Sequence, residues 1–181
     1  EFERILIDHG YDSGPIDGVI PTNNINTITS LSLNANSPFT NAWYNIQDLT
    51  GIEDFTALKS LVLLNAGNLT ILDISQNINL EHLYIGSSSL TILDVSQNIN
   101  LESLGVSGSY AITSIDVTNN LMLKELSLRG IAPLNVVDLT HNISLETLRL
   151  FNIGVTSLDL SNNTALSFIE ISETPLTSLD L

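Results

Sequence analysis

Apolar and polar residues follow a pattern that returns every 10 or 11 residues along most of the chain. The motif apolar-x-x-apolar-x-apolar begins at Leu58, Leu69, Leu80, Leu90, Leu101, Ile112, Leu123, Leu134, Leu145, Val155, Leu166 and Leu176. Two kinds of half-repeat alternate, so the true period is 21 or 22 residues. The constant half reads Leu-Thr-x-Leu-Asp-x-Ser/Thr-x-Asn and is nearly copied along the chain, whereas the variable half reads Leu-Glu-x-Leu and then changes.

Within each half the apolar residues occupy every second position, which is typical of a strand with one buried face. Leu72 and Ile74, for example, flank the polar Asp73, whereas a helix would need a period of about 3.6 residues. A unit this short cannot bury its apolar face alone, so the pattern predicts stacking into a solenoid of parallel strands about 4.8 Å apart. The predicted fold class is mainly β.

An asparagine closes each constant half, where the chain must leave the strand and turn. The column is formed by Asn77, Asn98, Asn120, Asn142 and Asn163. An inward amide at this point can bond to the backbone groups that a turn leaves unpaired, so we interpret the column as structural.

These motifs resemble the short bacterial type of leucine-rich repeat, whose consensus nests LxxLxLxxNxL with LxxLDLxxN. The resemblance covers residues 58–181, and its second segment recurs at Asp73, Asp94, Asp116, Asp138, Asp159 and Asp180. The asparagine of the first segment is replaced by Ser88, Ser109, Ile131, Ile153 and Thr174, which implies a weak or absent hydrogen-bond ladder on that side. The resemblance implies a leucine-rich repeat solenoid at a bacterial surface or in secreted form.

The start of the chain resembles the lead-in of such proteins. Residues 1–28 are predicted to form an N-terminal cap, with a short helix indicated by the spacing of Phe2, Ile5 and Leu6 and ended by Gly10. A turn-rich loop follows this helix, and a first strand is expected from Ile28 to Leu33.

Two further regions complete the predicted organisation. Residues 29–68 form a first irregular repeat with an insertion at 34–45, and residues 69–181 form the regular repeats. Because the chain ends inside a constant half with no polar cap, we expect a C-terminal truncation. The uncapped rung is also a candidate contact for a homodimer.

Composition and charge exclude several classes of protein. The chain has 20 acidic and 5 basic residues, a formal net charge of −15, and 43% hydrophobic residues. A nucleic-acid binder would be basic, and a disordered acidic tail would be poor in apolar residues. No run reaches the roughly 18 to 20 apolar residues of a membrane helix, so we expect no membrane insertion. The sequence has no cysteine and therefore no disulfide or thiolate metal site.

Motifs for chemistry are absent from the sequence. There is no phosphate-binding loop, no H-E-x-x-H and no G-x-S-x-G, and His9, His82 and His141 occupy unrelated positions of the repeat. The aspartate column could collect calcium, but a simpler interpretation is that each aspartate accepts hydrogen bonds from turn amides or from hydroxyls, such as that of the threonine three residues earlier. We therefore predict no enzyme, no cofactor and no metal site.

Positions that change from rung to rung are free to serve recognition, so the variable half is the predicted binding surface. The candidate binding residues are His82, Tyr84, Arg129, Arg149, Phe151 and Phe168, with Trp43 and Tyr44 of the insertion. Arginine and aromatic residues are common anchors of protein interfaces, and aromatic rings also stack on sugars. In the alternative interpretation, Arg129 and Arg149 only pair with Glu125 and Glu170, and the insertion folds back over the core edge.

Three functions are consistent with this surface. The first is a non-catalytic module that binds a protein partner at a bacterial cell surface or in secreted form. The second is a carbohydrate-binding module, although an acidic polysaccharide would meet the charge of −15. The third is a structural spacer, for which the variable half would have no special importance.

Overall fold

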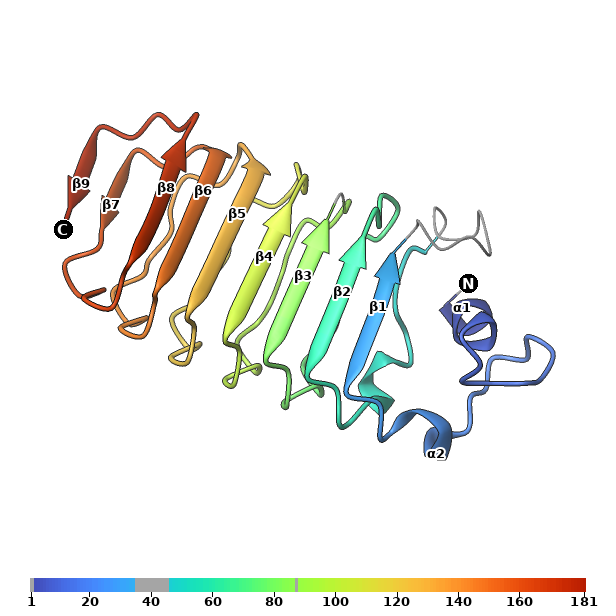
Figure 1. Cartoon of the computed structure of the whole chain (residues 1–181). Helices are drawn as coiled ribbons and strands as arrows, with labels where there is room; N and C mark the ends of the chain where they lie inside the picture. The colour runs from blue at the N-terminus through green and yellow to red at the C-terminus, as the bar shows by residue number, and fades with distance from the viewer. Residues whose placement is uncertain (1, 35–45, 87) are drawn as a thin grey trace.

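The chain folds into a solenoid of parallel strands that begins with short helices (Figure 1). The computed structural model describes residues 2–34, 46–86 and 88–181. Helix α1 spans Phe2–Asp8, α2 spans Thr22–Ile25, and a 3-10 helix spans Ile52–Asp54. Within the described ranges, no helix is long and apolar enough to cross a membrane. The candidate residues Trp43 and Tyr44 lie outside the described residues.

One sheet of seven parallel strands runs the length of the solenoid. Its strands, in spatial order, are β1 (Ser30–Asn34), β2 (Ser60–Leu64), β3 (His82–Gly86), β4 (Ser103–Ser107), β5 (Glu125–Ile131), β6 (Thr147–Ile153) and β8 (Phe168–Ser172). A second sheet pairs β7 (Ser157–Asp159) with β9 (Ser178–Asp180). The predicted mainly β solenoid with a short N-terminal helix is confirmed.

Inward leucines from successive strands stack directly on one another and form the core. Leu83 pairs in register with Leu104, and Leu104 with Leu126, and all three side chains are fully buried. The core continues without interruption from α1 to Leu160. Each rung therefore buries its apolar face against its neighbours, as a unit too short to fold alone requires.

Helix α1 covers the open end of this core. Phe2, Ile5 and Leu6 are buried, and the ring of Phe2 lies 6.1 Å from that of Phe55. Gly10 has φ +77°, a conformation that L side chains rarely adopt, so the helix ends where the sequence predicted. The first strand begins at residue 30, two residues later than predicted, because the N–H of Ile28 closes a turn on the carbonyl of Ile25.

The asparagine column ties each turn to the preceding rung. Asn120 is fully buried, and its Nδ2 donates to the carbonyls of Val95 and Asn98 at 3.0 and 2.9 Å. The same pair of bonds, shifted by one repeat, is made by Asn77, Asn98, Asn142 and Asn163. The structural interpretation of this column is confirmed.

The other side of the solenoid has a different and shorter ladder. The Oγ atoms of Ser88 and Ser109 lie 2.7 Å apart in a buried hydrogen bond. In the next two rungs the equivalent positions hold Ile131 and Ile153, which are buried in the core. The ladder predicted to be weak or absent is therefore one hydrogen bond followed by apolar packing.

The aspartate column lies in the middle of the constant halves, where their turns begin. Oδ1 of Asp116 accepts hydrogen bonds from the N–H and the hydroxyl of Thr118, at 2.9 and 2.7 Å. The expectation that turn amides and nearby hydroxyls bind the aspartates is confirmed. The hydroxyl belongs to the residue two positions later, whereas the earlier threonine Thr70, for example, donates to the carbonyl of Gln47. Among the residues described, paired strands in the constant halves are limited to β7 and β9 and a single bridge between Leu93 and Ile115.

These turn bonds lower the pKa of the aspartates. The hydroxyl and then the backbone N–H of the residue two positions later are the main causes for Asp73, Asp94, Asp116, Asp138 and Asp159. Repulsion from neighbouring aspartates opposes the shift at Asp94 but is smaller. At these five positions the local turn bonds favour the ionised carboxylate.

Asn120→Ala removes the two buried hydrogen bonds that its amide donates to the carbonyls of Val95 and Asn98, while each carbonyl keeps a backbone N–H as a second donor. We expect the free energy of unfolding to fall by about 2 kcal/mol. Urea denaturation followed by circular dichroism measures this loss. The control is Asn119→Ala, an exposed neighbour whose removal should change stability by less than about 0.5 kcal/mol. Equal stability of the two variants would contradict the structural role of the column.

Because of the aspartate turns, we expect the free energy of unfolding to fall in acid. Their folded-state pKa is below the unfolded value of about 3.9, so their contribution is complete above that pH and is lost as the pH falls through the folded pKa. Urea unfolding at a series of pH values from about 6 to about 3 should show this decline.

The matched variants separate the turn bonds from net charge. Asp116→Asn with Asp138→Asn keeps an acceptor oxygen that does not titrate, so the decline should become shallower. Glu146→Gln with Glu173→Gln removes the same charge outside these turns and should keep the slope. Stability that stays constant or rises in acid would contradict the assignment.

Candidate functional site: the open face of the sheet

The outward face of the seven-stranded sheet is the candidate interface. Successive side chains of a strand point to opposite faces, so the residues between the buried leucines form columns toward solvent. We name these positions the open face. From β2 to β8 they are Ser60, Val62, Leu64, His82, Tyr84, Gly86, Ser103, Gly105, Ser107, Glu125, Ser127, Arg129, Thr147, Arg149, Phe151, Phe168, Glu170 and Ser172.

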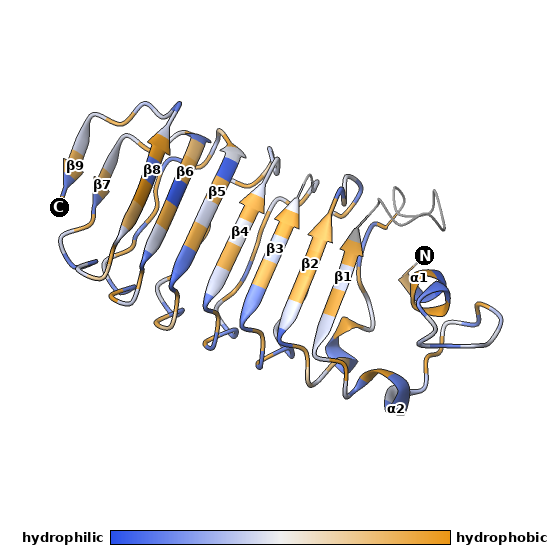
Figure 2. Cartoon of the chain, in the orientation of Figure 1, coloured by the Kyte–Doolittle hydropathy of each residue, from blue (hydrophilic) through white to orange (hydrophobic). Residues whose placement is uncertain are grey.

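The open face has a neutral half and a charged half. Figure 2 shows β2, β3 and β4 mainly in orange and white, whereas β5 and β6 carry blue segments. The positions on β2 to β4 are occupied by serine, glycine, Val62, Leu64, His82 and Tyr84, whereas β5 to β8 hold two arginines and two glutamates. Two chemically different surfaces therefore lie side by side on one sheet.

Arg149 is the centre of the charged half. Its Nη1 lies 2.6 Å from Oε1 of Glu125, its Nε lies 3.8 Å from Oε2 of Glu170, and its Cζ lies 4.8 Å from the ring centroid of Phe168. Arg129 joins through Nη2, at 3.2 Å from the same Oε2 of Glu170. The alternative predicted from sequence, in which both arginines pair with Glu125 and Glu170, is therefore correct as to the pairing.

The same contacts hold two aromatic side chains beside the arginines. Phe151 pairs in register with Arg129 on β5 and with Ser172 on β8, so Phe151 and Phe168 occupy adjacent strands. Phe168 is 45% exposed and Phe151 is half-buried. Ion pairs between exposed side chains contribute little to stability, so the main effect of this network is to hold the side chains in place.

Tyr84 and His82 form a separate group on β3. The ring of Tyr84 lies against Gly105 of β4, where a Cβ atom would come within 2.6 Å of Tyr84 Cδ1. Leu64 approaches Gly86 in a similar way, because a Cβ at Gly86 would lie 3.1 Å from Leu64 Cδ2. Sequence reasoning missed both glycines, although a glycine at an outward strand position is itself a signal of close packing.

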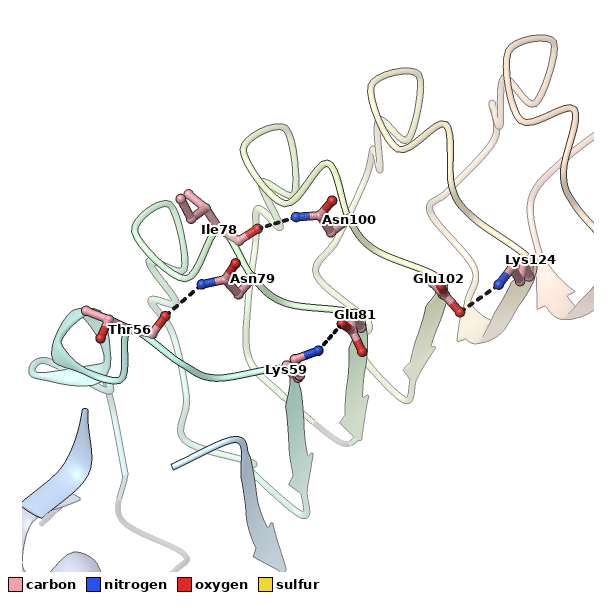
Figure 3. Close-up of polar contacts among 8 residues, drawn as sticks. All are labelled: Thr56, Lys59, Ile78, Asn79, Glu81, Asn100, Glu102 and Lys124. Carbon is pink, nitrogen blue, oxygen red and sulfur yellow. Dashed lines mark hydrogen bonds and ion pairs between the residues drawn. The ribbon is translucent and has the colours of Figure 1, made fainter. Parts of the chain in front are cut away.

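A row of acids and lysines lines the start of the strands (Figure 3). Lys59 Nζ lies 2.6 Å from Glu81 Oε1, and Lys124 Nζ lies 2.9 Å from Glu102 Oε2. The hydrogen bond between Lys124 and Glu102 lowers the pKa of the glutamate and raises the pKa of the lysine. These acids are paired with lysines across rungs and are not arranged as an acid/base couple.

A cavity of about 640 Å³ lies between the cap and residues 47–54, and its lining includes Phe2, Leu6 and Ile25. Two of its carboxylates already bind parts of the fold. Glu3 accepts the N–H groups of Asp17 and Gly18. Asp48 accepts the N–H and the hydroxyl of Thr50, and these bonds lower the pKa of Asp48.

Metal ligands do not gather in the part of the chain that the structure describes, where no three His, Asp or Glu side chains could hold an ion together. The three histidines lie on separate elements: His9 follows α1, His82 is in β3, and His141 is in a turn. The open face offers hydrogen bonds, charge and aromatic surface, which are the means of non-covalent recognition.

No protein-family model matches the sequence, and no curated protein is similar enough to count as a relative. Similar solved structures do exist. The functional domain of InlJ from Listeria monocytogenes, described as including a cysteine ladder, shares 24% identity and a TM-score of 0.51. A leucine-rich repeat protein of Leptospira interrogans shares 18% and a TM-score of 0.58, and internalin C2 of L. monocytogenes shares 14% and 0.55.

The extent of these similarities differs from one structure to the next. The alignments cover 87%, 88% and 96% of this chain, but 42%, 50% and 84% of the respective structures. The chain therefore spans about half the length of the first two. At these identities the likeness concerns the fold, and it agrees with the stacked strands and the buried asparagine column. The chain is a leucine-rich repeat solenoid with the fold of these bacterial leucine-rich repeat proteins.

Proposed function

We propose that the chain is a protein-binding module that holds its partner on the open face. The observation that carries this proposal is the network in which Glu125 and Glu170 hold Arg149 and Arg129 beside Phe168. Arginine and aromatic side chains dominate the binding energy of protein interfaces. On this chain they occupy adjacent strands at positions that change from rung to rung.

The pairing of the arginines supports this role. Association loses free energy when mobile side chains become ordered, about 0.5 to 1.5 kcal/mol for each long side chain. Arg149 already lies between two glutamates and over the ring of Phe168, so its side chain loses less conformational freedom when a partner binds. The two arginines and two glutamates also balance in charge, which favours a partner with both signs of charge over a purely basic or acidic one.

The fold suggests a setting for this function. We propose that the chain acts at a bacterial cell surface or in secreted form, because the proteins of similar fold are bacterial and the sequence resembles surface proteins of this type. On this proposal the module is non-catalytic and its partner is a protein met outside the cell.

One observation favours a second candidate, carbohydrate binding. The ring of Tyr84 lies against its register partner Gly105, and the next outward position on β4 is Ser107, which is partly exposed. An aromatic face beside a hydroxyl is suited to a sugar ring. The charged half has no part in this candidate, so the two functions depend on different residues and can be separated.

Photo-crosslinking tests whether a partner contacts the open face. Benzoylphenylalanine placed at Phe151 should crosslink a discrete protein from a cell-surface extract, whereas the same group at Ile92, which is 73% exposed outside the sheet, should not. Arg129→Ala with Arg149→Ala should reduce the yield at Phe151 at least about tenfold, equivalent to about 1.4 kcal/mol. Crosslinking at Ile92 alone, or a yield unaffected by the arginines, would contradict the proposal.

Affinity electrophoresis through gels containing neutral and acidic polysaccharides tests the second candidate. A protein-binding module should migrate without retardation in every gel. Retardation that is lost in Tyr84→Ala, but kept in the control Tyr110→Ala, would instead establish carbohydrate binding on β3. Tyr110 suits the control because it is 71% exposed and lies outside the strands.

A further inference from the structure

A row of exposed aliphatic side chains runs along the turns that follow the buried asparagines. Four turns place an aliphatic residue directly after the asparagine on the surface: Ile78 (55% exposed), Ile99 (56%), Leu121 (53%) and Ile143 (62%). Together with Met122 (50%), which follows Leu121, we name these side chains the edge stripe. The stripe crosses four successive rungs and belongs neither to the core nor to the open face.

The turns that carry the edge stripe have no charged residue. Residues 75–80, 96–101, 118–123 and 140–145 contain no Asp, Glu, Lys or Arg, in a chain with a net charge of −15. Charged columns run on both sides, with the aspartates before the turns and a mixed row of Glu81, Glu102, Lys124 and Glu146 after them. The edge stripe is therefore a neutral, apolar strip on a strongly acidic molecule.

Hydrogen bonds hold the stripe in a straight line. Asn79 donates from Nδ2 to the carbonyl of Thr56 at 2.9 Å, and Asn100 donates to the carbonyl of Ile78 at 3.0 Å. In Figure 3 the side chain of Ile78 points away from the strands while its carbonyl accepts this bond. The turns that carry the aliphatic side chains are thus already ordered, so burying these side chains would cost little backbone conformational entropy.

The residues beside the stripe indicate which partner fits. On one side Gln76 and Gln97 are exposed, and on the other side Asn79 and Asn100 are exposed. An amide both donates and accepts hydrogen bonds, so a row of amides can pair with an identical row, which two rows of carboxylates cannot do. An apolar centre with an amide rim is complementary to itself, as a two-fold interface requires.

We infer that two copies of this chain associate through the edge stripe, antiparallel and about a two-fold axis. The turns are the surface where two copies with a charge of −15 meet without opposing carboxylates at the point of contact. Five half-exposed side chains per copy make a small interface, near the lower limit of about 1,000 Å² for specific association. The dimer is therefore weak and reversible.

Charge gives this dimer a distinctive dependence on salt. The aspartate column beside the stripe, on a chain with a net charge of −15, repels its counterpart across the interface. Added salt screens that repulsion, since the Debye length falls from about 30 Å at 0.01 M to about 3 Å at 1 M. Apolar contact is not weakened by such screening. Association should therefore strengthen as salt is added, whereas a contact held by ion pairs would weaken.

Sedimentation equilibrium of the full chain at about 10 to 500 µM, in about 0.02 M and about 0.5 M NaCl, tests the inference. The average mass should rise from 19.6 kDa toward twice that value with concentration, and the rise should be larger at the higher salt. Ile99→Ser with Leu121→Ser should restore the monomer mass at every concentration. Both side chains are exposed, so thermal unfolding should show that this variant folds like the parent.

Two controls locate the contact. Ile71→Ser with Ile92→Ser removes two aliphatic side chains that are 64% and 73% exposed outside the stripe, and this variant should still dimerise. Ile169→Lys places a charge on the last strand of the main sheet and should also still dimerise. A monomer at all concentrations and salts, loss of the dimer in either control, or a dimer that survives Ile99→Ser with Leu121→Ser would each overturn the inference.

Discussion

The stacking of one rung on the next is the constraint on which the rest of this structure depends. A single rung of 21 or 22 residues has too few apolar side chains to form a core, and its leucines become fully buried only between two neighbours. The turns are coupled in the same way, because their carbonyls accept an additional hydrogen bond from an asparagine of the next rung. Asn120 shows the principle, since both carbonyls that it binds belong to the rung before it. Stability, strand register and the straight line of the turns all follow from this coupling.

Stacking also divides the residues of each rung between scaffold and surface. The demand for a buried leucine, a turn aspartate and a ladder asparagine is the same in every rung, so the constant half is nearly copied. The outward positions of the open face are not fixed by this packing requirement. Its residues differ on each strand, which allows Arg149, Glu125 and Glu170 to form a network on three strands while Tyr84 lies over Gly105 on two others. A repeated scaffold thus carries a surface that is not repeated.

Much of this architecture could be predicted from the sequence because repetition reveals what every rung needs. The period-two leucines, the asparagine column and helix α1 follow from local patterns that stacking reinforces. The partner of each aspartate was harder to predict, because a hydroxyl lies on either side of it and only the turn geometry selects the later one. The bond between Ser88 and Ser109 was missed for a related reason, since the resemblance directed attention to the asparagine that those rungs lack. On the open face, the pairing of Arg129 and Arg149 depended on side-chain directions that a strand pattern does not specify.

We propose a division of roles in which the buried columns serve stability and the open face serves binding. Saturation mutagenesis of the chain, with protease resistance and retention of the captured partner as two separate readouts, separates these roles. Substitutions at Leu126 and Asn120 should lower both readouts, whereas substitutions at Arg149 and Phe151 should lower retention and leave protease resistance unchanged. Substitutions that lower retention alone, found among the exposed residues of the constant halves and absent from the open face, would contradict this division of roles.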